Sequence, residues 1–408
     1  MGDTVLFLAD IPAGDRLNTF DLAVEDAPGG HAASEDAATI RQSEPLQSDG
    51  FRRFDTGAFE IELCTGKANG RTNGKWGIRF FRPAGRAESL IKDYSNSMGG
   101  VFGPYFTPEN GLINPPEHAI ANATVVDEGP LFAHYRFDVN VPSGLDPQLD
   151  GSQIHIDWRF YAGTPWFERT YRISDYSTTI DRMPASNTMT VGDEFESGQG
   201  RVLFDGFSAS RSTVFRAGDP YSLVLIQAVQ DALNSIGGDA SPVIEEYRQA
   251  MAGGVENESY DFYWKVLCSL EPYLSDETRT RVLDEIVNAS HEAVRRDLIE
   301  APLLEQDVAE VRVHPQETIF VRDADKTAMI DSATGDTVVW HTSQVVRRYQ
   351  IVQRPQSGWV NWGTNGENEF PELPSGSTIR LAFGRFDDWK QQADRLATSV
   401  RVELMERE

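Results

Sequence analysis

Histidine, arginine and acidic side chains alternate with apolar ones along three consecutive segments of the chain. The polar positions are His134, Arg136 and Asp138 in residues 132–140, His155, Asp157, Arg159 and Tyr161 in 154–161, and Glu168, Thr170 and Arg172 in 166–173. Alternate side chains of a β-strand point to opposite faces of its sheet, so these residues are expected to share one face. Histidine and tyrosine can exchange protons, and arginine can bind a carboxylate through two parallel hydrogen bonds.

This polar face is the first candidate site. We expect His134, His155 or Tyr161 to act as base or acid and Arg159 to stabilise negative charge, with Arg136, Asp157 and Glu168 binding the ligand. A solvated face without function is the alternative, with pairs such as Asp157 and Arg136 acting as ordinary cross-strand contacts. The face carries two of the seven histidines of the chain, which favours function.

A second candidate is the loop 103–118, which is rich in proline and glycine and is therefore stiff. It carries Tyr105, Asn110, Asn114 and His118 as possible ligand contacts. Binding residues often lie on loops held by a rigid scaffold, although asparagines also cap turns in purely structural loops.

Two further clusters carry weaker signals. Trp362 lies in a stretch of tryptophans and amides, 359–369, whose composition is typical of a sugar-contacting loop. Asp193, Glu194 and Glu196 could supply the two carboxyl groups of a glycoside hydrolase, but in so acidic a chain a charge run is expected at the surface. No phosphate loop, dinucleotide fingerprint or metal-ligand spacing is present, so we expect neither a cofactor nor a metal.

The elements that must position these residues are mainly β-strands. Alternating apolar residues and turn signals from residue 51 to 235 predict an antiparallel β-sandwich, whose segments 131–141, 153–161 and 166–173 form hairpins. Residues 1–50 are expected to hold a short strand and a flexible loop, and 236–305 a helical insertion. β patterning returns in 306–408, at 309–314, 318–322, 337–342, 345–352 and 378–383, before a C-terminal helix near 387–398.

The run IHIDWRFYAGTPWFERTYRI, residues 154–173, resembles the strand–turn–strand pattern of galactose-mutarotase-like β-supersandwich domains. The stretch VFGPYFTPENGLINPPEH before it is similar to the loop that borders a concave sugar-binding sheet in such folds. These domains occur in sugar epimerases, polysaccharide lyases and certain α-mannosidases. The resemblance implies a carbohydrate-active protein, which we expect to be a lyase or epimerase of a uronate-containing or modified sugar. A glycoside hydrolase using Glu168 and Asp157, and a non-catalytic carbohydrate-binding or accessory subunit, are the alternatives.

The composition limits the other partners. The chain has 63 acidic and 37 basic residues, a formal net charge of −26, and only six lysines among its basic residues. Nucleic acids and anionic membranes need a basic footprint, so neither is expected as a partner, whereas a carbohydrate and a second copy of the chain are compatible. The sequence shows neither a signal peptide nor a stretch of membrane-spanning length, so we expect a cytoplasmic protein.

The surplus of acidic residues also predicts adaptation to high salt, because salt screens repulsion within a dense carboxylate surface. The melting temperature is therefore expected to rise between about 0.1 M and 3 M potassium chloride. Thermal unfolding followed by circular dichroism checks this, and a melting temperature that does not change over that range contradicts it.

Overall fold

The computed structural model describes seventeen parts of the chain. They are residues 39–43, 50–66, 76–91, 98–103, 105–107, 111–113, 121–140, 152–174, 177–180, 183–196, 203–209, 213–217, 241, 311–312, 317–353, 358–363 and 372–397. The predicted N-terminal strand and, apart from residue 241, the predicted helical insertion lie outside these ranges.

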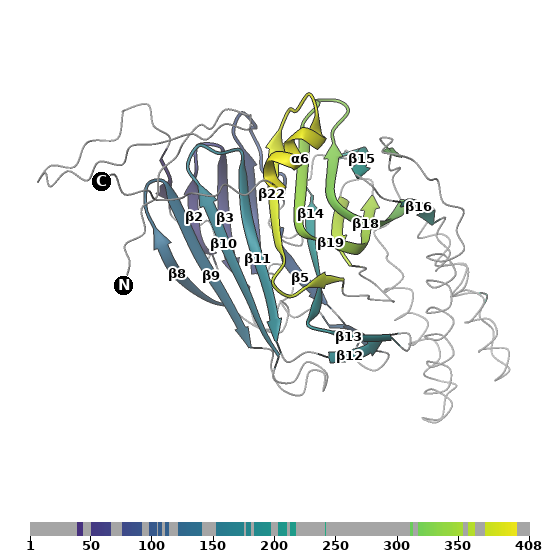
Figure 1. Cartoon of the computed structure of the whole chain (residues 1–408). Helices are drawn as coiled ribbons and strands as arrows, with labels where there is room; N and C mark the ends of the chain where they lie inside the picture. The colour runs from purple at the N-terminus through teal and green to yellow at the C-terminus, as the bar shows by residue number, and fades with distance from the viewer. Residues whose placement is uncertain are drawn as a thin grey trace, which may run out of the picture.

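The described residues form a large sheet, a smaller sheet and two hairpins (Figure 1). The smaller sheet has the order β1 (Arg41–Ser43), β2 (Gly50–Asp55), β3 (Phe59–Thr65) and β4 (Trp76–Pro83). The main path of the large sheet is β17 (Val311–Arg312), β15 (Gly206–Ala209), β18 (Glu317–Ile330), β19 (Thr337–Gln353), β22 (Thr378–Gly384), β11 (Trp166–Ser174), β10 (Gln153–Tyr161), β9 (Phe132–Asn140) and β8 (Asn122–Glu128).

Further strands extend this framework. The large sheet also includes β5 (Gly100–Gly103), β14 (Thr188–Phe195), β16 (Thr213–Ala217), β20 (Gly358–Trp362) and β21 (Leu373–Pro374). The hairpins are β6 (Tyr105–Thr107) with β7 (Gly111–Ile113) and β12 (Ser177–Ile180) with β13 (Met183–Ser186). The pairings between these strands are antiparallel, which confirms the predicted fold class.

The expected hairpin strands β9, β10 and β11 are confirmed, and their alternation separates two faces. Along β9 the burial alternates between half-buried and buried residues from Phe132 to Val139. The buried face packs onto the smaller sheet, with Phe54 against Phe160 at 4.8 Å and Phe59 against Phe167 at 5.9 Å between ring centroids. The hydrophobic effect of burying these rings is thus what orients the polar set outward.

β19 corrects one prediction, because the expected strands 337–342 and 345–352 are a single strand, Thr337–Gln353. Its pairing with β18 shifts register between Ala324 and Lys326, and Asp323 has a positive φ of 51°. This register shift, at which β19 carries the extra residues, leaves Val345 exposed in mid-strand and breaks the alternation that a sequence pattern relies on. Of the expected strand 309–314, Val311–Arg312 lies among the described residues and forms β17.

The C-terminal helix is confirmed as α6 (Trp389–Ala397), which lies across the face of the large sheet near β22 and β19 (Figure 1). Its buried residues Ala393 and Leu396 pack on Ala328, Val339 and Ala382 of that face. Within the described part of the chain, no helix has the length and apolarity that crossing a membrane requires.

A buried ion pair crosses the core. Arg169, on the inner face of β11, donates from Nη2 to Asp193 Oδ2 of β14 at 2.7 Å, and both side chains are fully buried. Trp340 Nε1 donates to the same oxygen at 2.7 Å, and the backbone N–H of Gly99 donates to the other at 2.8 Å. The pair therefore joins β11, β14, β19 and the segment before β5.

Gly99 is required at this junction for two reasons. Its φ of +78° is a left-handed conformation, and a Cβ there would lie 2.5 Å from Trp158 Cη2. Its carbonyl also accepts the Tyr171 hydroxyl at 2.8 Å. A side chain at this position would displace the backbone N–H that serves Asp193.

Removing one member of the Arg169–Asp193 pair is expected to destabilise the fold severely. Asp193→Asn or Arg169→Met leaves the other charge buried without its counter-ion, at a cost of about 3–5 kcal/mol. Urea unfolding in molar potassium chloride measures this loss in the free energy of unfolding. The double variant R169M/D193N is the control, expected to recover part of the loss because neither charge remains. A loss below about 1 kcal/mol in the single variants, as for a surface pair, contradicts this account.

Candidate functional site

The outer face of β9, β10 and β11 brings the predicted polar residues together in cross-strand rows. From one end of the strands to the other, the strand register and the ring contacts define four rows. They are the aromatic row (Phe132, Tyr161, Trp166), the Glu168 row (His134, Arg159, Glu168, Arg380, His341, Lys326), the Asp157 row (Arg136, Asp157, Thr170, Thr378) and the His155 row (Asp138, His155, Arg172).

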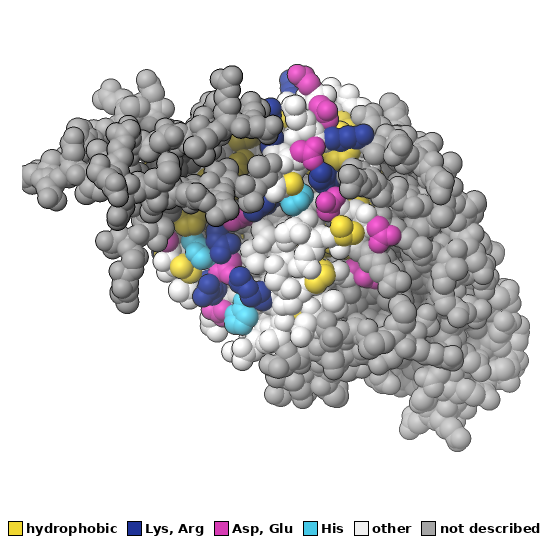
Figure 2. Space-filling model, in the orientation of Figure 1, with side chains coloured by type: hydrophobic (Ala, Val, Ile, Leu, Met, Phe, Trp, Pro, Cys, Tyr) yellow, Lys and Arg dark blue, Asp and Glu magenta, His cyan; other side chains and the backbone are white. Residues whose placement is uncertain are grey.

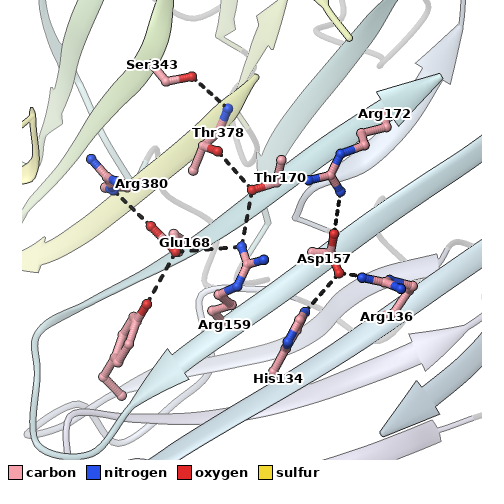
Figure 3. Close-up of polar contacts among 11 residues, drawn as sticks. His134, Arg136, Asp157, Arg159, Glu168, Thr170, Arg172, Ser343, Thr378 and Arg380 are labelled. Carbon is pink, nitrogen blue, oxygen red and sulfur yellow. Dashed lines mark hydrogen bonds and ion pairs between the residues drawn. The ribbon is translucent and has the colours of Figure 1, made fainter. Parts of the chain in front are cut away.

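Asp157 is the hub of this face (Figure 3). Its carboxylate accepts hydrogen bonds from His134 Nε2 at 2.8 Å, Arg136 Nε at 2.9 Å and Arg172 Nη1 at 2.5 Å. The three donors come from two strands, β9 and β11, on either side of β10. The Asp157 side chain itself is only 1% exposed, so its donors cover it.

The donors decide the charge state of Asp157. Burial alone would raise the pKa of this carboxyl, but the hydrogen bonds from His134, Arg172 and Arg136 outweigh it and lower the pKa to about 2. Asp157 is therefore an anion throughout the neutral range. It can fix cations in place, but it holds no proton to donate to a substrate.

The guanidinium groups of Arg136 and Arg172 converge on Asp157 while remaining open to solvent. Their side chains are 43% and 48% exposed. Arg136 Nε and Arg172 Nη1 bond to Asp157, and the other guanidinium nitrogen atoms of the two residues have no hydrogen-bond partner within the described ranges. Figure 2 shows basic and histidine side chains gathered on this face around acidic ones. The hub therefore holds two cations against one buried anion, with N–H donors left over for a ligand.

His155 forms a separate pair with Asp138. Its Nδ1 lies 2.5 Å from Asp138 Oδ1, and about a third of each side chain is exposed. An ionised carboxylate accepts the Nδ1 proton, which leaves Nε2 as the atom with a free lone pair. No described residue bonds to that Nε2. His134, by contrast, is tied to Asp157 and nearly buried, so it serves the hub.

Glu168 is the second acceptor on this face (Figure 3). It takes a hydrogen bond from Arg380 Nε at 2.9 Å and one from the Tyr161 hydroxyl at 3.2 Å, and it lies 3.7 Å from Arg159 Nη1. Arg159 also donates to Thr170 Oγ1 at 3.3 Å. Arg380 links the site to α6, because its Nη1 donates to the Leu396 carbonyl at 2.6 Å.

The Tyr161 hydroxyl, which the sequence offered as a base or acid, is a hydrogen-bond donor to Glu168 in the structure. Burial, followed by the nearby Glu168 carboxylate, raises the pKa of the Tyr161 hydroxyl above its ordinary value. The hydroxyl stays protonated and donates to Glu168. In the Glu168 row, burial and then Arg380 lower the pKa of His341, so its buried imidazole is neutral.

The remaining predicted residues fall outside this constellation. Trp362 is a correction: it is fully buried, with the Arg169 guanidinium 5.5 Å from its ring and Trp340 at 6.0 Å, because β20 turns it into the core. Tyr105 lies in the β6–β7 hairpin, and its side chain is not among those described. Asn110, Asn114 and His118 lie outside the described residues.

The acidic run after residue 192 also departs from the surface position that was expected. Asp193 is fully buried, and Glu194 and Glu196 are nearly so. Asp193 holds Arg169 and Trp340, so its carboxylate is already used inside the core.

Several residues of the face were not chosen from sequence as site residues. Arg172 and Asp138 alternate with core residues like their neighbours, so the signal was present. Arg380 and Thr378 come from a strand more than 200 residues after β11, and only the pairing of β22 with β11 brings them in. Among the described residues, no group of three histidine, cysteine or acidic side chains is placed to hold a metal ion.

Comparison with known proteins gives only a distant likeness. No family model matches the chain, and no curated protein matches it in sequence. A putative aldose 1-epimerase from Klebsiella pneumoniae has 9% identity and a TM-score of 0.44, with 89% of each chain covered. One from Escherichia coli has 8% identity and a TM-score of 0.36, covering 81% of this chain and 97% of that chain.

An alpha-mannosidase from Enterococcus faecalis has 9% identity and a TM-score of 0.35, covering 87% of this chain and 31% of that chain. Sugar epimerases and α-mannosidases are among the proteins in which galactose-mutarotase-like domains, which the sequence resembles, occur. At these identities and TM-scores, no activity, substrate or catalytic residue is carried over to this chain.

The low pKa of Asp157 predicts a pH-dependent contribution to stability. Folding lowers this pKa from 3.8 to about 2, so the contribution is complete above the unfolded value and is lost as the pH falls through the folded one. The free energy of unfolding of wild type is expected to be roughly 2 kcal/mol larger than that of Asp157→Asn near neutral pH. This difference is expected to shrink below about pH 4.

Urea unfolding at several pH values measures the difference, and carbon-13 NMR of the carboxyl groups gives the pKa directly. Asp138→Asn is the matched control, because the exposed Asp138 side chain has one partner, His155, among the described residues. The ordinary pKa of an aspartate is about 4, and a titration midpoint of Asp157 at that pH contradicts this account.

Proposed function

We propose that the outer face of β9, β10 and β11 binds a carbohydrate that bears a carboxylate and acts on it as a lyase or epimerase of uronate-containing sugars. One observation carries this proposal. Arg136 and Arg172 converge on buried Asp157, and the His155–Asp138 pair lies in the next row. Anion recognition and a proton acceptor therefore occur side by side.

The two guanidinium groups suit a carboxylate ligand. Asp157 fixes one edge of each group, and the remaining N–H donors can take a second carboxylate in the bidentate geometry that arginine favours. Two positive charges against one buried negative charge leave the hub attractive to anions, although the chain as a whole is strongly acidic. Neutral hydroxyl groups would find donors and acceptors in Arg159, Glu168 and Thr170.

Lyases and epimerases of uronates share a first step. A base removes the proton from the carbon beside the carboxylate, and the electron pair of that C–H bond moves into the carboxylate to give an enolate. In elimination, the pair then forms a C=C bond while the glycosidic C–O bond at the next carbon breaks, and the leaving oxygen takes a proton from solvent water. In epimerisation, solvent water supplies a proton to the opposite face of the same carbon.

His155 is the base in this proposal. Asp138 holds its Nδ1–H and leaves Nε2 free to accept the proton. Arg172 is its direct cross-strand partner, so the group that stabilises the enolate charge is adjacent to the base. The hydrolase alternative is weaker, because the Asp157 carboxylate is 1% exposed beneath its three donors and cannot reach a sugar as the nucleophile or base, while its low pKa excludes it as the general acid.

The experiment is a turnover assay with uronate oligosaccharides in molar potassium chloride, which follows unsaturated product by absorbance and epimers by NMR. His155→Gln is expected to lower kcat by about 10²–10⁴-fold, with ligand affinity within a few-fold of wild type. Arg172→Lys keeps a charge beside Asp157 but loses the planar fork, so it is expected to raise KM.

Gln153→Ala is the matched control, because Gln153 lies two residues before His155 on the same strand and face and is exposed. It is expected to keep wild-type kinetics. Full turnover by His155→Gln contradicts the assignment of the base. Binding without turnover by wild type contradicts the enzymatic part and leaves a carbohydrate-binding protein.

A further inference from the structure

The aromatic row lies on the same outer face as the proposed site. Phe132, Tyr161 and Trp166 come from β9, β10 and β11, and each of these residues is partly exposed. The Phe132 and Tyr161 centroids are 5.3 Å apart and those of Tyr161 and Trp166 are 4.7 Å apart, both pairs being tilted by 40°. The three rings thus form a continuous strip across three strands.

This strip is not part of the sandwich core. The residues that enter the core from the same strand ends are Ala133, Phe160 and Phe167, all of which are buried on the opposite face. At its β11 end the strip meets α6, where Trp166 packs with Phe386 and Trp389 on the small apolar cluster beneath the helix. At its edge toward the site, the Tyr161 hydroxyl bonds to Glu168.

A partly exposed aromatic strip beside a polar row suits an amphipathic ligand. A pyranose has apolar C–H faces that stack on rings and hydroxyl groups at its edge that need donors and acceptors. Arg159 and Glu168 lie in the row next to the strip and offer both. The strip therefore matches a sugar unit lying against the rings with its hydroxyls turned toward the Glu168 row.

The distance between the strip and the anion hub sets the size of the ligand. Phe132 and Arg136 are four residues apart on β9. At the rise of a β-strand this separation is roughly 13 Å, which exceeds the width of a single monosaccharide. A ligand that reaches both rows must contain linked sugar units.

We infer that the aromatic row is a subsite for a neighbouring sugar unit, so that the substrate is an acidic oligosaccharide or polysaccharide whose chain runs along the strands, and not a monosaccharide. This inference rests on the proposed function. The carboxylate of one unit lies at Arg136 and Arg172, and a linked unit stacks on the strip of Phe132, Tyr161 and Trp166.

The test is calorimetric titration, in molar potassium chloride, of uronate saccharides of increasing length from one to four units. For wild type, affinity is expected to rise about tenfold or more from one unit to three. Trp166→Ala and Phe132→Ala are expected to lose most of this gain, while their affinity for the single unit stays near wild type. Arg172→Lys is expected to weaken binding of every length and to keep the gain.

Trp389→Ala is the matched control, because Trp389 packs on the same apolar cluster from α6 and lies outside the strip. It is expected to keep the length dependence. If the Trp166 variant does not fold, NMR of a bound trisaccharide on wild type replaces it, and ring-current shifts are expected on the C–H protons of a unit other than the one at the hub.

The outcomes separate the two claims. A gain with length that survives in folded Trp166→Ala and Phe132→Ala overturns the subsite and leaves the proposed function intact. A trisaccharide without ring-current shifts does the same. If wild type binds no uronate saccharide of any length, the proposed function fails and the subsite fails with it.

Discussion

The buried ion pair between Arg169 and Asp193 fixes the register of β11, and the polar face on the other side of the sheet follows from that register. Arg169 is the charged residue among the inward-facing positions of β11, and its counter-ion belongs to β14. A shift by one residue would turn Arg169 outward and bring Glu168 or Thr170 into the core. Tryptophan and backbone donors complete the shell of Asp193, so the pair is fully bonded on the acid side.

Two carboxylates organise the two faces of the same sheet by the same physical means. Asp193 gathers its donors inside the core, and Asp157 gathers its donors at the boundary with solvent. The difference lies in the exposure of the arginines. Arg169 has no exposed surface, so its pair is structural, whereas Arg136 and Arg172 are half exposed and keep donors for a ligand. In a chain of net charge −26, this local excess of cations is the basis on which we propose an acidic ligand.

The alternation of β9, β10 and β11 was readable from the sequence because each strand follows the period of two without interruption. The pairing of strands that are distant in the chain could not be predicted from the sequence, because nothing in residues 378–384 indicates that Arg380 lies beside Glu168. The extra residues of β19 at its register shift against β18 split the pattern of β19 into two apparent strands. Trp362 and Asp193 were misplaced for a common reason: composition alone does not tell which side of a sheet a polar or amphipathic side chain faces.

The account depends on where an acidic oligosaccharide lies on the protein, and a crystal structure with a bound uronate trisaccharide measures this most directly. We expect one carboxylate within hydrogen-bond distance of Arg136 and Arg172, with its ring beside His155 and a linked unit over Trp166. A trisaccharide bound anywhere else on the chain, with the outer face of β9–β11 left empty, would contradict the account.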